Sequence, residues 1–440
     1  MKTKQNNKTQ SERNSIVSKF VSGGLLLGLA TQSFAATPTG RLVVHEWGTF
    51  TSVQGSNGVS LQGLQHEDES LPDFVYGRDS LKEGATVAES GPGDRGGSGG
   101  TGNPGDWPHG HGHGKRVEPQ MLARADTSIT QKLETPVVYF YSDHAQTVNV
   151  DVDFPGGVIS QWFPNATQFA PPVGGNQRLA NGSMSWSVDV LDHAASVPTI
   201  PQDSIWAPSR KVNSNFVSFK GENEKFIFYR GLGNFKTSFT VESKKGSYTL
   251  ANSSAQDIPS AFLIRVTAGS HPQGFIKPLG NIAAHHTMML DASEIPALDA
   301  DFDHYLKSVS ENLGKALVES GLFADEAQAM VNTWSKSYFK TPGTRVLYVL
   351  PRAWTDAILP IRVTPQPTSL IRTLVGRVEV LSQEEERNLE AGLQDLKPET
   401  TQSFVNDLGR FAEPKLRRVI GLTRQNSVRK TGEEILREIQ

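Results

Sequence analysis

The sequence predicts a mainly β protein, with an antiparallel, sandwich-like β unit followed by a helical region that contributes further strands. Three observations predict this fold class. Short runs rich in Val, Ile, Phe, Tyr and Thr alternate with turn residues between positions 41 and 267. From residue 301 the apolar residues recur at helical spacing. After residue 345, strongly β runs return.

The expected strands of the β-rich part follow one another at short intervals. They cover residues 41–53, 136–154, 157–163, 183–191, 216–219, 224–230, 236–242 and 261–267. Such spacing is typical of an antiparallel sandwich. Between the first two runs lies a long insertion whose residues 91–114 are dominated by glycine. Because this segment buries too little to offset its chain entropy, we expect it to be disordered.

The helical part begins after residue 300. A first apolar stripe covers residues 302–317, and Gly321 follows it at a position where a left-handed residue would end the helix. A second stripe covers residues 324–339. Ser382 and Glu385 then form a capping box, which predicts a helix over residues 383–396.

The remaining segments complete the expected domain organisation. The β runs 345–351 and 370–381 either belong to a second domain or return to the first sheet. A helical stretch over 399–412 is expected to be cut by Pro414. The predicted parts are a signal peptide (1–35), a β-rich domain (36–295), an α+β domain (296–424) and a loosely held charged tail (425–440).

Composition and the N-terminal residues indicate where the protein works. Lysines and an arginine precede a short apolar stretch, and Ser33-Phe34-Ala35 fits a cleavage site, which predicts export to the periplasm or beyond the cell. Since a membrane span needs about 20 apolar residues, we expect no transmembrane segment in the mature chain. A net charge of -3 gives no basis for a nucleic-acid partner. Without cysteine, any metal site must be built from His, Asp and Glu.

The stretch VHEWGTF places titratable and aromatic side chains in the first expected strand. Neighbouring side chains of a strand point to opposite faces, so His45 and Glu46 are not expected to bind one ion together. A buried Glu46 requires a cation or hydrogen-bond donors, whether its role is structural or catalytic. His45 is either a hydrogen-bonded structural residue or a metal ligand, and Trp47 is a candidate for substrate contact.

Further charged residues follow at the ends of other strands. Glu134 precedes a strong strand, and with Glu46 it would form the carboxylate pair that acid/base hydrolysis uses. Arg230 precedes a Gly-x-Gly-like turn that could expose backbone N–H groups to an anion. The segment PRAWTD combines Arg352 and Trp354, as candidate substrate-binding residues, with Asp356, as a candidate catalytic acid. Structural ion pairing is the alternative for all these charged residues.

The insertion contains the most metal-like composition of the chain. His109, His111 and His113 alternate with glycine, and imidazole suits Zn, whereas the acidic run HEDE at 66–69 would suit Ca. A divalent metal such as Zn or Ca is therefore the cofactor that these side chains would hold. The histidine tract is expected either to capture metal weakly or to close over a site.

Several stretches resemble a family of uncharacterised exported bacterial proteins. They are VHEWGTFTSV, KLETPVVYFYSD, SQWFPNA, EKFIFYRGLGNF and GTRVLYVLPRAWTDAILPIRVTPQP followed by LVGRVEVL. Because these stretches extend over most of the mature chain, the resemblance concerns the whole architecture. It implies export and a shared fold, and it implies no activity, substrate or cofactor. Residues 91–114 are not part of the shared pattern.

Three functions agree with these observations. The first is an exported hydrolase acting on polysaccharide or peptide, with carboxylate acid/base or metal-assisted chemistry. The second is a non-catalytic module that binds carbohydrate or cell-envelope material through a row of exposed aromatic side chains, namely Trp162, Phe163, Trp186 and Trp206. The third is a periplasmic metal-binding protein. The expected partner is a small molecule, a glycan or a peptide.

Overall fold

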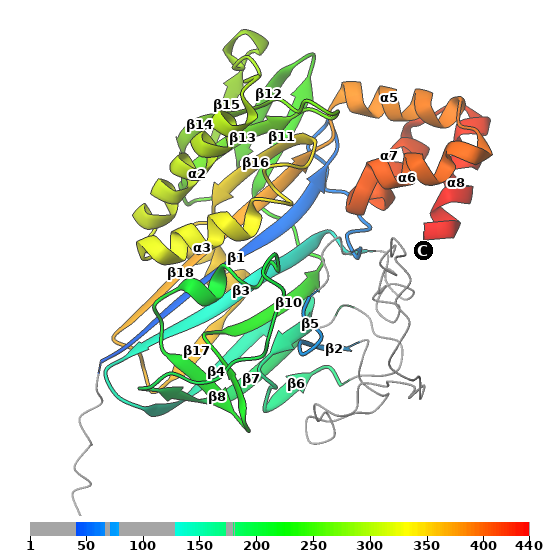
Figure 1. Ribbon diagram of the computed structural model, residues 1–440. Coiled ribbons are helices and arrows are strands. Elements are labelled where there is room, and N and C mark those ends of the chain that lie inside the picture. The colour runs from blue at the N-terminus through cyan, green and yellow to red at the C-terminus, as the bar shows by residue number, and fades with distance from the viewer. Residues whose placement is uncertain (1–40, 67–70, 79–127, 173–178, 180, 440) are drawn as a thin grey trace, which may run out of the picture. The chain divides into compact units, whose positions relative to one another are not determined.

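A nine-stranded sheet organises the protein (Figure 1). The computed structural model describes residues 41–66, 71–78, 128–172, 179 and 181–439. In spatial order the strands are β14 (Gly274–Ile282), β13 (Ile258–Val266), β16 (Gly343–Val349), β18 (Ser369–Val380), β1 (Leu42–Gln54), β3 (Gln131–Ser142), β10 (Ile227–Gly233), β5 (Gly157–Phe163) and β2 (Tyr76–Gly77). Neighbouring strands pair antiparallel, except that β1 pairs with β18 in parallel.

Two smaller sheets accompany the large one. The first contains β17 (Ile361–Thr364), β4 (Gln146–Phe154), β7 (Gly182–Leu191), β8 (Phe216–Phe219) and β9 (Glu222–Glu224), with β6 (Gln168–Ala170) paired to β7. The second contains β11 (Phe239–Lys244), β12 (Ser247–Asn252) and β15 (His286–Leu290). Trp186 of β7 packs on Tyr229 of β10, with 5.8 Å between ring centroids, so sheet lies on sheet. The predicted mainly β fold class with antiparallel sheets is confirmed.

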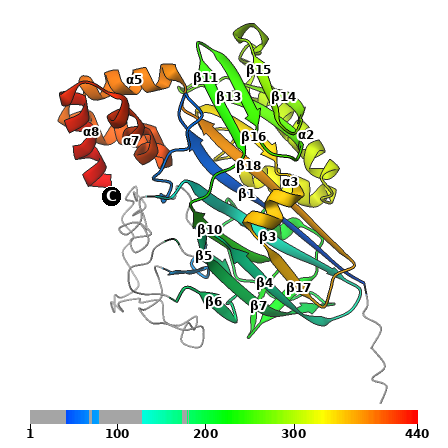
Figure 2. The same cartoon turned by 180° about the vertical axis from the view of Figure 1, so that it is seen from behind.

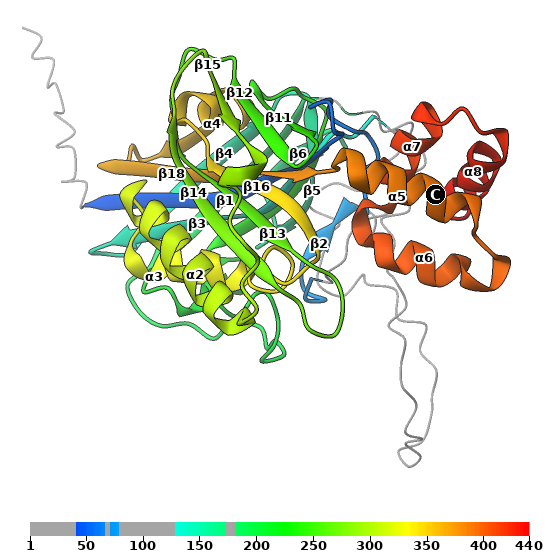
Figure 3. The same ribbon diagram turned by 90° about the horizontal axis from the view of Figure 1, so that it is seen from above.

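Helices follow and interrupt the strands of the second half. They are α2 (Phe302–Glu319), α3 (Ala324–Trp334), α4 (Arg352–Ile358), α5 (Gln383–Gln394), α6 (Thr401–Leu408), α7 (Ala412–Leu422) and α8 (Asn426–Ile439). Figure 3 shows α2 and α3 on the opposite side of the large sheet from β11 and β12. The last four helices share an apolar cluster of their own at one end of the sheet (Figure 2). No helix among the described residues is long and apolar enough to cross a membrane.

Strands from both halves of the chain form the large sheet. β16 pairs with β13, and β18 lies beside β1 from Val43 opposite Ser369 to Gln54 opposite Val380. The chain from Gly40 to Gln440 is accordingly one compact unit. The predicted division near residue 295 does not correspond to a boundary, because the late strands β16 and β18 are buried along most of their length and lie between the early strands β13 and β1. The expected signal peptide and the segment 91–114 lie outside the described residues.

Local signals place the helix ends well. Gly321 has a φ of +108° just after α2, as its position predicted. Ser382 and Glu385 form the predicted capping box of α5, in which each side chain accepts the backbone N–H of the other residue.

Two expectations for the C-terminal segment are wrong. Pro414 lies in the first turn of α7, where its missing N–H costs no helical hydrogen bond, and so it does not end a helix. The supposed tail forms α8, whose Val428, Ile435 and Leu436 are buried. These residues recur at helical spacing, and the charged residues between them face solvent.

The stabilising role of the α5 capping box can be tested by substitution of Ser382. Ser382→Ala should lower the free energy of unfolding by about 1 kcal/mol, because the Glu385 N–H loses its acceptor. Ser382→Asp keeps an acceptor and should stay within a few tenths of a kcal/mol of the parent protein. Urea unfolding followed by circular dichroism compares the two, and equal losses would contradict the role of the cap.

Candidate functional site

Glu46 lies in a closed ion-pair network. It is fully buried, and its Oε2 is 2.5 Å from Nε of Arg372, its direct neighbour on β18. The Tyr229 hydroxyl donates to Oε1 of the same carboxylate. Arg372 in turn donates to the carbonyl of Leu359 at 2.6 Å and to Oδ1 of Asp356 at 2.8 Å. Both oxygens of Glu46 are thus occupied by groups of the protein.

The residues of PRAWTD lie at the solvent end of this network. Arg352 pairs with Asp356 at 2.7 Å along α4, and both side chains are about half exposed, at 46 % and 47 %. The indole Nε1 of Trp354 donates to Gln256. Asp356 is therefore linked to Glu46 through Arg372, while Arg352 does not itself meet Glu46.

His45 lies on the other face of β1, as strand alternation predicts. Its Nδ1 is 2.8 Å from Oε2 of the buried Glu326, and its ring lies 4.5 Å from the ring of Phe323. Glu326 also accepts the Tyr141 hydroxyl at 2.7 Å and the Phe323 N–H at 2.7 Å. His45 therefore helps to join β1 to the start of α3.

The predicted metal sites receive no geometric support within the described part of the chain. No group of three or more His, Cys, Asp or Glu residues there is placed to hold a metal ion. Among the described residues, the acidic side chain that pairs with His45 is Glu326. His109, His111 and His113 lie outside the described residues, as does most of the acidic run after His66.

Five of the aromatic residues that were predicted to contact a ligand are buried. Trp47 is fully enclosed in the main core, where it cannot touch a ligand at the surface. The residues expected to form an exposed row are at most 3 % exposed, namely Trp162, Phe163, Trp186 and Trp206. They belong to the same core cluster, because each belongs to or packs beside a sheet whose inner face is covered. The exposed aromatic row does not exist.

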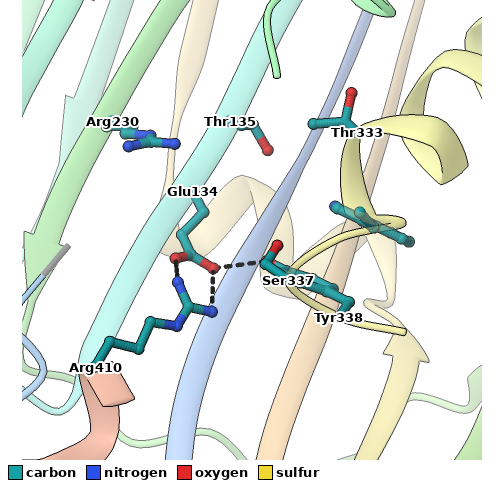
Figure 4. A pocket seen from close by; sticks show the side chains of 8 residues that line it. Glu134, Thr135, Arg230, Thr333, Ser337, Tyr338 and Arg410 are labelled. Atoms are coloured by element: carbon teal, nitrogen blue, oxygen red, sulfur yellow. Dashed lines mark hydrogen bonds and ion pairs between the residues drawn. The ribbon is translucent and has the colours of Figure 1, made fainter. Parts of the chain in front are cut away.

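Glu134, in contrast, lines a pocket (Figure 4). The cavity volume is about 20 Å³, room for about one water-sized group. The pocket is lined by Glu134, Thr135, Arg230, Thr333, Trp334, Ser337, Tyr338 and Arg410. Two predicted site residues, Glu134 of β3 and Arg230 of β10, therefore meet at one place. The other walls come from the end of α3 and from the turn Gly409–Phe411 before α7.

Three side chains hold the Glu134 carboxylate. The Thr51 hydroxyl donates to Oε2 at 2.6 Å. The Tyr338 hydroxyl also donates to Oε2 at 2.6 Å, and Arg410 forms an ion pair with Oε1 (Figure 4). Burial alone would raise the pKa of Glu134, but Arg410, Lys132 and Arg377 together hold this pKa well below its usual range. The carboxylate is therefore charged at neutral pH and is unsuited to donate a proton.

The backbone at the pocket is irregular. The register of β3 shifts against both of its neighbours, β1 and β10. Thr135 has a φ of +51° there, a conformation that costs a β-branched residue about 1–3 kcal/mol. A Cβ at Gly48 would lie 3.0 Å from Pro136, so glycine is needed for β1 to approach this irregular segment. Such strain is commonly found at functional sites.

The pocket residues that the sequence did not reveal come from distant elements. Trp334 and Tyr338 belong to an apolar helical stripe, which is typical of a core-facing helix. Arg410 follows a helical stretch without any local motif. The dipeptide Thr135-Pro136 gives no signal for the positive φ of Thr135, because the residue before proline favours extended backbone.

The lowered pKa of Glu134 predicts that the stability of the protein depends on pH. A carboxyl group whose pKa is lowered by folding contributes stability that is complete above its unfolded pKa, 4.5, and that is lost as the pH falls through the folded value. Glu134→Gln should therefore destabilise the protein at pH 7, and the difference from the parent should shrink as the pH falls below about 4.5. Urea unfolding at several pH values measures this difference, and a constant difference would contradict the lowered pKa.

Comparison with known proteins assigns no family. No protein-family model matches the chain, and no curated protein matches it. The resemblance to exported bacterial proteins stays a prediction.

Proposed function

We propose that the protein is exported and binds a small polar ligand in the pocket beside Glu134. The observation that carries this proposal is the convergence of a charged carboxylate, two arginines and a strained backbone segment on one cavity. The charged lining residues come from β3, β10 and the C-terminal helical region, so folding brings distant segments together at this point. A rigid sheet beneath them supports a preformed binding site.

Hydrolysis has weaker support than binding. An acid/base pair requires two carboxyl groups of different pKa that reach one substrate. Both oxygens of Glu46 are occupied by Arg372 and Tyr229, whereas Glu134 stands in a separate set of contacts with Thr51, Tyr338 and Arg410. A carboxylate held in its charged form orients a ligand more readily than it transfers a proton to one. The hydrolase is retained as an outcome of the experiment below.

The experiment is a binding screen followed by a blocking variant. Monosaccharides, amino acids, short dicarboxylates and phosphate are titrated into the mature protein by calorimetry and NMR. Ser337 lines the pocket and is partly exposed, so Ser337→Trp should fill the cavity and abolish binding. Lys336→Trp, on the exposed neighbouring residue outside the lining, is the matched control and should bind as the parent does.

The outcomes separate the alternatives. Binding that Ser337→Trp removes and Lys336→Trp retains supports the proposal. Binding that survives in Ser337→Trp places the ligand elsewhere and overturns it. NMR spectra recorded over time also show whether a bound sugar derivative or peptide is cleaved, which would favour the hydrolase instead.

A further inference from the structure

The four C-terminal helices form a bundle with a core of its own. Helices α5 to α8, residues 383–439, share a cluster of buried apolar side chains that includes Leu393, Leu416 and Val428. Among the described residues, no member of this cluster also belongs to the apolar clusters of the sheet. These helices contact one another more extensively than any of them contacts a strand. The helical bundle is therefore a small body that is attached to the sheet without sharing its apolar core.

The attachment of the helical bundle to the sheet contains little apolar contact. Within the described part of the chain, Phe411 is the one apolar side chain of the bundle that clusters with residues of the sheet. Burial of one such side chain contributes about 1.5–3 kcal/mol. Next to Phe411, Arg410 forms an ion pair with Glu134. At the start of the bundle, the Ser56 hydroxyl donates to Glu386 at 2.7 Å. Two bodies that meet through a mainly polar interface are expected to move relative to each other.

The helical bundle covers one face of the chain at the end of β1. Val53 and Gly55 point to the same side, because alternate residues of an extended chain share a face. Val53 belongs to the same apolar cluster as Phe411, and a Cβ at Gly55 would lie 2.7 Å from Nε of Arg418. Val53 has no exposed surface. A movement of the bundle away from the sheet would therefore expose Val53.

The same bundle closes the pocket. Arg410, in the turn before α7, lines the cavity and reaches the Glu134 carboxylate (Figure 4). The other walls are held by the sheet and its core, since Glu134 belongs to β3 and since Trp334 and Tyr338 belong to the main core cluster. The closed cavity of about 20 Å³ has room for one water-sized group. A larger ligand can therefore enter only if a wall moves, and the wall at Arg410 belongs to the separately packed body.

We propose that the helical bundle is a lid, which moves away from the sheet as one body and thereby admits a ligand to the pocket beside Glu134. This inference rests on the proposed function, since it describes how the same pocket is reached. The connection between β18 and α5, residues 381–382, is the hinge of the movement. Opening separates Arg410 from Glu134 and leaves the cores of the bundle and of the sheet intact.

The test measures how fast single buried thiols react in the folded protein. The sequence contains no cysteine, so one introduced thiol reports on one position. Val53→Cys lies under the bundle, Val428→Cys lies in the core of the bundle, and Val44→Cys lies in the main core; all three valines have no exposed surface. With an excess of a thiol reagent under native conditions, the Val53→Cys thiol should react at least about 100-fold faster than the other two, because local opening requires less free energy than unfolding.

A change at the latch extends the test. Arg410→Met removes the charge that pairs with the buried Glu134, and opening would then return the unpaired carboxylate to water. In this background the Val53→Cys thiol should react at least about tenfold faster than in the parent. The Val44→Cys thiol, measured in the same background, shows whether the whole protein has been destabilised instead. Lys430→Met is the matched control, because it breaks an exposed pair with Glu434 within α8 and should leave the rate unchanged.

The outcomes separate the lid from the pocket. If the Val53→Cys thiol reacts as slowly as the Val44→Cys thiol, the bundle does not open; the lid inference is then wrong, and the proposed ligand pocket stands. Equally fast reaction of the Val428→Cys thiol would mean that the helices unfold, which also overturns a lid that moves as one body.

A ligand found in the binding screen links the opening to the pocket. Because such a ligand binds the open and closed forms differently, saturation with it should change the reaction rate of the Val53→Cys thiol. An unchanged rate with a ligand whose binding is lost in Ser337→Trp would show that the pocket is reached by another route, and the lid inference would fail alone. If the screen yields no ligand, the proposed function fails and the admission of a ligand fails with it, whereas the thiol rates still decide whether the bundle opens.

Discussion

Glu46→Gln should lower the free energy of unfolding by about 3–5 kcal/mol, the usual cost of removing one partner of a buried ion pair. The substitution keeps the shape of the side chain and removes the counter-charge of Arg372, whose guanidinium lies 2.5 Å away. Both side chains have no exposed surface, so water cannot replace the lost charge. Urea unfolding followed by tryptophan fluorescence measures the loss.

Asp356→Asn is the matched control. It breaks the second ion pair of the same arginine, at 2.8 Å, but Asp356 is 47 % exposed. Because solvent screens such a pair, it contributes only about 0–1 kcal/mol to the free energy of unfolding. Equal effects of the two substitutions would mean that the buried pair does not anchor β1 to β18. If Glu46→Gln instead left the protein stable but abolished a hydrolytic activity, Glu46 would be a catalytic residue.

The sequence predicts features that local rules determine. Strand alternation correctly separates His45 from Glu46, since the two side chains meet α3 and β18 respectively. The ends of α2 and α5 were predictable because Gly321 and Ser382 act within one helical turn. By contrast, the partner of Glu46 lies 326 residues away along the chain, on a parallel strand. No local pattern sets that pairing or its register.

The candidate site was predictable only in part, for the same reason. Glu134 and Arg230 could be singled out as charged residues at strand ends, and they do line one pocket. Trp334 and Tyr338 could not be singled out, because they belong to an apolar stripe at helical spacing. Such a stripe is typical of a helix that faces the core, and it does not distinguish core residues from residues that line a pocket. Arg410 reaches Glu134 across 276 residues of sequence, which only the packing of the C-terminal helices brings about.

A second buried ion-pair group connects the scaffold to the pocket. Glu379 accepts hydrogen bonds from Arg345 at 2.9 Å and from Arg377 at 2.9 Å. Arg345 also donates to the backbone carbonyl of Tyr338, and the Arg377 guanidinium lies 4.2 Å from the centre of the Tyr338 ring. Tyr338 in turn donates to Glu134. Arg345 and Arg377 thus hold Tyr338, which forms one wall of the pocket. Glu379 is the shared counter-charge of both arginines.

Glu379→Gln should therefore have two effects. It should lower the free energy of unfolding by about 3–5 kcal/mol, because two buried guanidinium groups lose their shared counter-charge. The two arginines hold the pKa of Glu379 at about 2, so this loss should be full at pH 7 and should diminish below about pH 4.5. It should also weaken binding of the proposed polar ligand at the pocket, because Tyr338 loses the support that orients its hydroxyl toward Glu134.

Urea unfolding measures the first effect. Calorimetric titration of a ligand found in the binding screen measures the second, at a temperature well below the unfolding midpoint of the variant. Glu319→Gln is the control, because it breaks an exposed pair with Lys315 along one helix and should change stability by less than about 0.5 kcal/mol. A destabilised Glu379→Gln protein with unchanged ligand affinity would show that the arginines secure the sheet without positioning Tyr338. Weaker binding in the folded variant would show instead that the buried charges of the scaffold also set the geometry of the pocket.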